Sequence, residues 1–155
     1  PTESVQMKDK HVFEALIKAI QASEQYEGNF GYAIGDASAV LSRVDGPDHS
    51  AVPSDYLAFL SAFGFGELDA AFHLDDGPEH YSTLTGREIA GGEGLYVFGG
   101  NQSDLLYAFN SKSGWQVVQI SCELDEIEPV ASNFSDFILA KLTYINALVE
   151  WRAAN

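Results

Sequence analysis

The chain has 155 residues, which suits one domain with room for a substantial hydrophobic core. Hydrophobic residues make up 46% of it, which argues against disorder, and no apolar run approaches the length that spans a bilayer. Eight basic and 23 acidic residues give a net charge of 8 − 23 = −15. This excludes nucleic-acid and anionic-membrane binding, because both need a surplus of positive charge.

The N-terminal third of the chain is predicted to begin with a helix and continue as a loop. Residues 8–27 carry apolar side chains at spacings of three and four, the period of an amphipathic helix, and Gly28 ends the pattern. Residues 33–53 contain glycines and prolines, and we expect a loop there with a short strand over residues 39–41.

A second helix has clear boundary signals. Pro53 and Ser54 mark its start, with Ser54 as the expected N-cap and Asp55 favourably placed in the first turn. Aromatic and aliphatic residues then form an apolar stripe, and Gly64 is a natural end. The density of aromatic residues predicts that this helix is mostly buried.

From Phe65 onward the apolar residues alternate, which predicts strands. We expect a strand over residues 68–74, followed by a turn at 75–78. An edge element is expected over 123–130, and residues 81–92 stay unassigned. The remaining strands are expected over residues 95–98, 105–109 and 115–120, with turns at 99–104 and 110–114.

The C-terminal segment shows the strongest helical pattern in the chain. Ser132 is the expected N-cap, and the apolar face consists of Phe134, Phe137, Ile138, Leu142, Ile145, Leu148 and Val149. Because strands that are adjacent in sequence usually pair, the fold class is predicted to be α+β. We expect one domain over residues 1–155, with an antiparallel meander sheet packed against N-terminal, central and C-terminal helices.

Signatures of catalysis are weak. The sequence contains no nucleophile elbow, phosphate-binding loop, dinucleotide fingerprint or zinc-protease motif. The single cysteine, Cys122, is expected to be a buried structural residue. Because one cysteine cannot form an internal disulfide, the sequence favours a reducing, cytoplasmic environment. Segment 73–80 holds histidines and carboxylates without the spacing of a calcium loop, so we expect a solvated acidic loop, no metal and no other cofactor.

The acidic residues are concentrated in two stretches, between Arg43 and Arg87 and between Lys112 and Lys141, neither of which contains a basic residue. Such stretches serve either solubility or docking to a cationic partner, and the sequence leaves both interpretations open. For docking, the candidate binding carboxylates are Glu67, Asp69, Asp75, Asp76, Glu79 and Asp104.

Residues 52–60 (VPSDYLAFL) are similar to the LP-x-x-Y-x-x-F-L helix of the SUKH superfamily. The fold of this superfamily is shared by bacterial immunity proteins and a fungal cell-wall synthesis regulator. Residues 96–109 resemble its central hairpin, and residues 115–120 resemble its next strand. Residues 131–138 resemble the A-x-S-F-x-x-F-L start of its closing helix. In all, the resemblance covers residues 52–142.

This resemblance implies a binding module, and it carries no catalytic residues to this chain. Bacterial members are typically immunity proteins that neutralise a polymorphic toxin by stoichiometric binding, and many such toxins are nucleases with cationic faces. We therefore expect a cytoplasmic, non-catalytic immunity protein with an acidic face that binds a basic toxin. A scaffold or regulatory module of the same fold and a small carboxylate-dependent hydrolase are the alternatives. The sequence makes no prediction of the oligomeric state.

Overall fold

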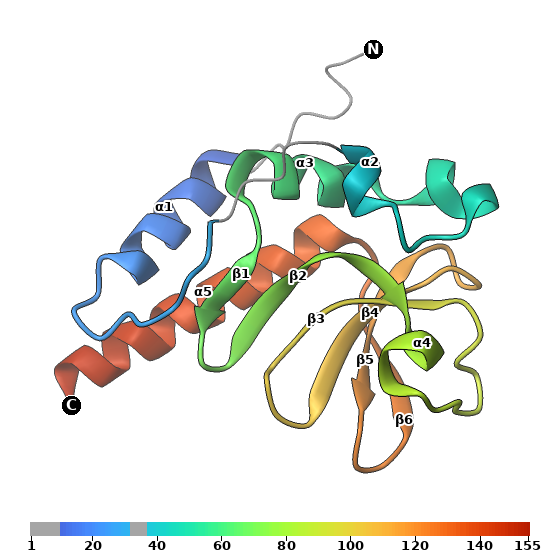
Figure 1. Cartoon of the computed structure of the whole chain (residues 1–155). Helices are drawn as coiled ribbons and strands as arrows, with labels where there is room; N and C mark the ends of the chain where they lie inside the picture. Colours follow the sequence, from blue (N-terminus) through green and yellow to red (C-terminus); the bar gives the residue numbers. More distant parts are fainter. Residues whose placement is uncertain (1–9, 32–36) are drawn as a thin grey trace.

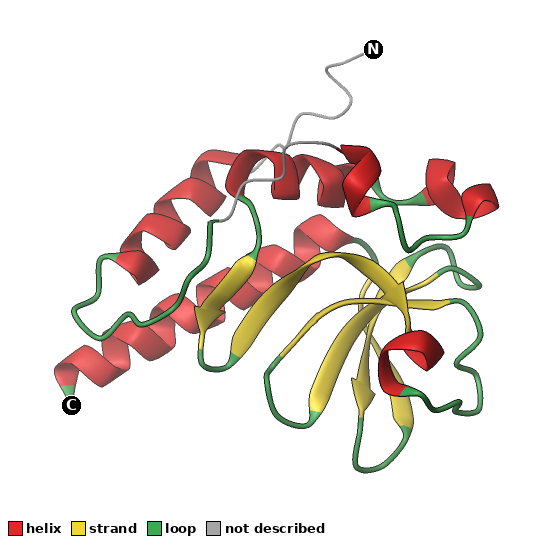
Figure 2. Ribbon diagram, in the orientation of Figure 1, coloured by secondary structure: helices red, strands yellow, loops and turns green. Residues whose placement is uncertain are grey.

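The computed structural model describes residues 10–31 and 37–155, and its central element is a six-stranded antiparallel sheet (Figures 1 and 2). Each strand pairs with the next one along the chain, so the order in the sheet is β1 to β6. The predicted meander and the α+β class are confirmed. The strands are β1 (Gly66–Asp69), β2 (Phe72–His80), β3 (Leu95–Gly100), β4 (Leu105–Asn110), β5 (Gln116–Ser121) and β6 (Glu126–Ala131).

Helices cover both faces of the sheet unequally. The long helices α1, α3 and α5 lie on one face, with α1 packed along α5, and the short helix α4 lies against the other face (Figure 2). No helix in the described ranges is long and apolar enough to cross a membrane. The helices are α1 (Lys10–Gln21), α2 (Ala37–Val40), η2 (Gly46–Ala51, a 3-10 helix), α3 (Ser54–Phe63), α4 (Tyr81–Thr85) and α5 (Phe134–Ala154).

The helix ends differ in detail from the prediction. Gly64 ends α3 as expected, with a φ of 92° and its N–H donated to the Leu60 carbonyl. Ser54 is the first helical residue, so it is not the N-cap. The cap of α5 is Asn133, one residue after the predicted Ser132, because its side-chain oxygen accepts the N–H of Asp136 at 2.8 Å.

Three predicted segments were wrong. The first helix ends at Gln21, before Gly28, and its expected start at residue 8 lies outside the described residues. Residues 39–41, expected as a strand, belong partly to α2, whose Val40 is buried against β2. Residues 68–74 turn at 70–71 into two strands, and the expected turn at 75–78 lies inside β2, where the register shifts between Leu74 and Glu79.

The main core fills the space between the sheet and the long helices and is unusually aromatic. Phe98 on β3 lies near its centre, with its ring centroid 4.5–5.7 Å from the rings of Tyr56, Phe109, Phe134 and Phe137. A second, smaller core lies on the opposite face of the sheet under α4. Its buried members are Tyr81, Leu95, Val97, Ala108, Val118 and Ile120. The strands β3 to β5 are therefore buried on both faces.

Both outer edges of the sheet are protected. The outer edge of β1 is occupied by the preceding chain, because Asn29 and Gly31 donate their N–H groups to the carbonyls of Glu67 and Phe65, each at 2.9 Å. At the other edge, β6 has the sequence EIEPVA, and its charged residues and its proline disfavour pairing with another strand.

Tyr56 is an anomaly in the main core and gives a testable prediction. Its side chain is fully buried, and its hydroxyl has no hydrogen-bond partner within the part of the chain that the structure describes. Removal of that hydroxyl in Tyr56→Phe is expected to raise the free energy of unfolding by about 1 kcal/mol, because a buried unpaired donor is destabilising. Urea denaturation at neutral pH measures the difference.

The pH dependence provides an independent check. Burial, and then the nearby charges of Asp75 and Asp76, raise the pKa of Tyr56 well above its ordinary value of 10.0. Because the hydroxyl of Tyr56 stays neutral to higher pH in the folded protein than in the unfolded chain, it contributes to the free energy of unfolding. This contribution is complete below pH 10.0 and is lost as the pH rises above it. The loss should be smaller in Tyr56→Phe, which has no hydroxyl at this position to ionise. As a control, Tyr96→Phe should destabilise, because the Tyr96 hydroxyl donates to Asp48 at 2.6 Å. A destabilised Tyr56→Phe would contradict the prediction.

Candidate acidic binding groove

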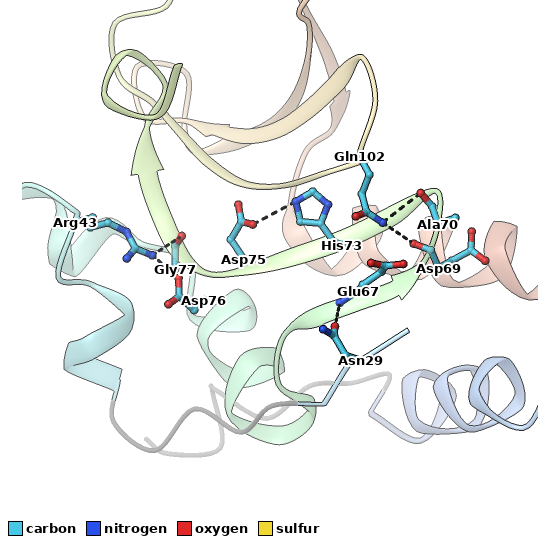
Figure 3. Close-up of polar contacts among 10 residues, drawn as sticks. All are labelled: Asn29, Arg43, Glu67, Asp69, Ala70, His73, Asp75, Asp76, Gly77 and Gln102. Carbon is cyan, nitrogen blue, oxygen red and sulfur yellow. Dashed lines mark hydrogen bonds and ion pairs between the residues drawn. The ribbon is translucent and has the colours of Figure 1, made fainter. Parts of the chain in front are cut away.

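An open groove of about 490 Å³ lies over the β1–β2 end of the sheet, and we call it the acidic groove. Carboxylates from both strands line it, together with Arg43, which follows α2, and Gln102 from the turn after β3 (Figure 3). Phe65 and Leu84 add apolar surface. The acidic side chains that line the groove are Glu67, Asp75, Asp76 and Glu79.

Strand alternation explains why polar side chains meet at this place. On β2, Phe72 and Leu74 point into the main core, so His73 and Asp75 point to the opposite face. Glu67 is paired directly with His73 across the β1–β2 ladder, which places its side chain on the same face. The second core does not extend over this end of the sheet, so these polar residues stay accessible.

A glycine on β3 makes room for the His73 ring. Gly100 is the β3 partner of His73, and a Cβ atom there would lie 3.2 Å from the His73 Cε1 atom and 2.9 Å from the Leu105 carbonyl oxygen. The imidazole therefore lies over a backbone without a side chain, with its Nε2 atom 3.3 Å from an Asp75 carboxylate oxygen (Figure 3). This contact holds Asp75 beside His73 at the floor of the groove.

Arg43 neutralises part of the groove. Its guanidinium forms an ion pair with Asp76 and donates to the Gly77 carbonyl at 3.5 Å (Figure 3). It also lies 3.7 Å from a carboxylate oxygen of Glu79. The hydrogen bond to Asp76 is the main cause that raises the pKa of Arg43, with added attraction from neighbouring carboxylates. Among the described lining residues, Arg43 is the only arginine or lysine, and its ion pairs are with Asp76 and Glu79 rather than with Glu67 or Asp75.

The six predicted binding carboxylates therefore separate into two groups. Glu67, Asp75, Asp76 and Glu79 line the acidic groove, whereas Asp69 and Asp104 do not. Asp104 lies in the β3–β4 turn, where its carboxylate accepts a hydrogen bond from the Asn101 side-chain amide at 3.1 Å.

Asp69 has a structural position instead. A bulge between Glu67 and Asp69 aligns Asp69 with Phe72, on the face of the sheet that meets the long helices. There it pairs with Arg152 of α5 at 2.7 Å, and only 7% of its side chain is exposed. The hydrogen bond to Asp69 raises the pKa of Arg152. Asp69 thus links β1 to the C-terminal helix and is not available in the groove.

The second acidic stretch contributes no residue to the groove. Glu126 and Glu128 are on β6, at the opposite edge of the sheet from β1, and Asp125 pairs with Arg87. The structure therefore divides the acidic residues between two edges and does not join the two stretches into one face. Only the stretch that follows Arg43 contributes to the groove.

Other candidate sites were not brought together. Within residues 10–31 and 37–155, no group of three or more His, Cys, Asp or Glu side chains is arranged to hold a metal ion. Cys122 lies just beyond β5. It is partly exposed, so its expected burial was wrong.

No protein-family model matches this chain, and no curated protein or solved structure shows a significant match to it.

Proposed function

We propose that this chain is a non-catalytic binding protein of the SUKH type, which neutralises a basic toxin in the cytoplasm by holding cationic side chains in the acidic groove. The observation that carries the proposal is the convergence of Glu67, Asp75, Asp76 and Glu79 on one open groove whose described lining holds a single arginine. The α+β architecture, an antiparallel sheet covered by helices, also agrees with what the resemblance to that family implies.

The chemistry of the groove suits a guanidinium or ammonium group. Arg43 is an internal example, since its guanidinium contacts Asp76, Glu79 and the Gly77 carbonyl together. The apolar surfaces of Phe65 and Leu84 are suited to the aliphatic part of a lysine or arginine side chain. A toxin that binds nucleic acid presents such side chains, and the carboxylates take the place of phosphates.

Long-range attraction adds to this local match. The net charge of −15 raises the rate of encounter with a cationic protein and repels anionic competitors. Binding should therefore weaken as salt is added, because mobile ions screen the attraction. A scaffold of the same fold would instead bind in a salt-tolerant way and leave the activity of its partner intact.

The double variant Asp75→Lys/Asp76→Lys tests the role of the groove. We expect at least about a tenfold slower association with the basic toxin domain that this proposal assigns to the protein as its partner, because charge reversal replaces long-range attraction by repulsion. Stopped-flow association at several salt concentrations measures the rate. To test neutralisation, wild-type protein is titrated into the toxin domain, and toxin activity should fall to zero at one equivalent.

The matched control is Glu126→Lys/Glu128→Lys at the opposite sheet edge. Both double variants change the net charge by the same amount, −15 + 4 = −11, so only the position of the change differs. The control should lose much less of the association rate. Equal slowing in both variants, or full toxin activity in the presence of excess wild-type protein, would refute the proposed function.

A further inference from the structure

An apolar stripe on α5 is left uncovered in the monomer. Tyr144 and Trp151 are 57% and 64% exposed, whereas the opposite side of the helix is buried in the main core. Three exposed alanines continue the line between and beyond them. The stripe consists of Ala140, Tyr144, Ala147, Trp151 and Ala154.

The spacing of the residues in the stripe indicates that its partner is another helix. Its residues alternate at intervals of four and three, the pattern of a seam along which one helix packs against another. Large and small side chains also alternate: alanine, tyrosine, alanine, tryptophan, alanine. A second helix fits this seam when its large side chains lie opposite the alanines.

A pocket lies at the N-terminal end of the same stripe. It has a volume of about 380 Å³ and opens between α5 and the end of β6. Ala140, Tyr144 and Val130 line it, and Tyr107 and Phe137 contribute aromatic surface. Lys141 also lines it, with its ammonium nitrogen 4.6 Å from the centroid of the Tyr107 ring. Gln119 and Asp136 also line it with oxygens able to accept an indole N–H. The pocket is thus suited to one large aromatic side chain with a polar edge.

We propose that α5 is the interface of a symmetric homodimer, in which the two α5 helices pack antiparallel and each Trp151 enters the pocket of the other copy. An antiparallel pairing places Trp151 opposite Ala140 of the second copy, and Tyr144 opposite its Ala147. Ala140 and Trp151 are about 16 Å apart along the helix axis. In a two-fold symmetric pair, each Trp151 therefore reaches the pocket beside Ala140 of the other copy, and the two contacts are identical.

Charge and size agree with a second copy as the occupant. The helix carries two acidic residues, Asp136 and Glu150, and two basic residues, Lys141 and Arg152, so its net charge is 2 − 2 = 0 in a chain of −15. A neutral surface allows two highly acidic molecules to approach each other. Tyr144 and Trp151 of the two copies are four aromatic side chains, each of which would bury ~150 Å² in the dimer. Together with the alanines and flanking residues, they bring the buried surface to roughly the 1,000 Å² of a weak specific interface.

Sedimentation velocity across the micromolar range tests the homodimer. The wild-type chain should show a monomer–dimer equilibrium. Trp151→Ala should weaken dimerisation by about 30-fold or more, since a buried tryptophan anchor is lost twice in a symmetric dimer. Ala147→Glu should have a comparable effect, because it places a charge against Tyr144 of the second copy.

The controls separate association from folding. Leu124→Ala removes a side chain that is 67% exposed in the β5–β6 turn, away from α5, and should leave the dimer unchanged. Circular dichroism should show the same helix content in every variant, because the substituted side chains are exposed in the monomer. A wild-type chain that sediments as a monomer throughout, or a dimer that tolerates both Trp151→Ala and Ala147→Glu, would overturn the proposal.

Discussion

Replacement of Phe98 by alanine is expected to lower the free energy of unfolding by about 4 kcal/mol. Phe98 is fully buried, and its ring contacts aromatic side chains of α3, β4 and α5, including Tyr56, Phe109 and Phe134. The loss has two causes, since buried apolar surface is removed and the rigid surrounding rings leave a cavity that they cannot fill. Denaturant titration followed by circular dichroism gives the value.

A graded series makes this prediction specific. Phe98→Leu keeps most of the volume and should lose less than half as much stability as Phe98→Ala. Leu124→Ala, at an exposed position, should change the free energy by less than about 0.5 kcal/mol. If Phe98→Ala were as mild as Leu124→Ala, the arrangement of the helices against β3 would be incorrect.

Gly77→Ala is expected to cost about 3 kcal/mol for a different reason, overpacking. A Cβ atom at Gly77 would lie 2.4 Å from the Val40 carbonyl oxygen and 3.2 Å from its carbonyl carbon. Because the contact is with backbone, no side-chain rotation relieves it, and α2 must move away from β2. Arg43 follows α2 directly, so the same shift should pull its guanidinium away from Asp76.

Two measurements check this result. Thermal and denaturant unfolding give the loss of stability, and the Arg43 side-chain resonances in NMR spectra report the loss of the pair with Asp76. Gly46→Ala is the matched control, because an added Cβ there has no neighbour within 4 Å among the described residues and the backbone φ is not positive. Stability should therefore change by less than about 0.5 kcal/mol. Equal effects at the two glycines would contradict the close approach of α2 to β2.

The sequence predicted the meander well because its signals are local. Short apolar strands alternate with turn residues from β3 to β5, and the N-terminal boundary of α3 is marked by Pro53. It failed at the β1–β2 hairpin because the turn there, Ala70–Ala71, lacks the residues typical of turns. Gly77 and Pro78 mimic a turn, but Gly77 is required by the contact with Val40. That contact is between segments distant in sequence, so no local pattern reveals it.

The candidate groove was predictable only in part, for similar reasons. A run of carboxylates without basic residues pointed to Asp75, Asp76 and Glu79, which are close in sequence. Regular alternation along β1 would place the side chains of Asp69 and Glu67 on the same face of the sheet. The bulge that moves Asp69 to the other face depends on the pairing of β1 with β2, which the sequence does not reveal. The ion pair of Arg43 with Asp76 joins residues 33 positions apart, so the neutralising charge could not be seen before the chain was folded.

The protected margins of the sheet restrict how this molecule meets other proteins. At the β1 edge the carbonyls of Glu67 and Phe65 and the N–H of Glu67 are already bonded to Asn29 and Gly31, and at β6 Pro129 has no main-chain donor. These features disfavour the addition of a partner strand to either edge of the sheet. Recognition must depend on the identity of side chains, which makes the choice of partner selective and guards a concentrated solution against fibril-like stacking.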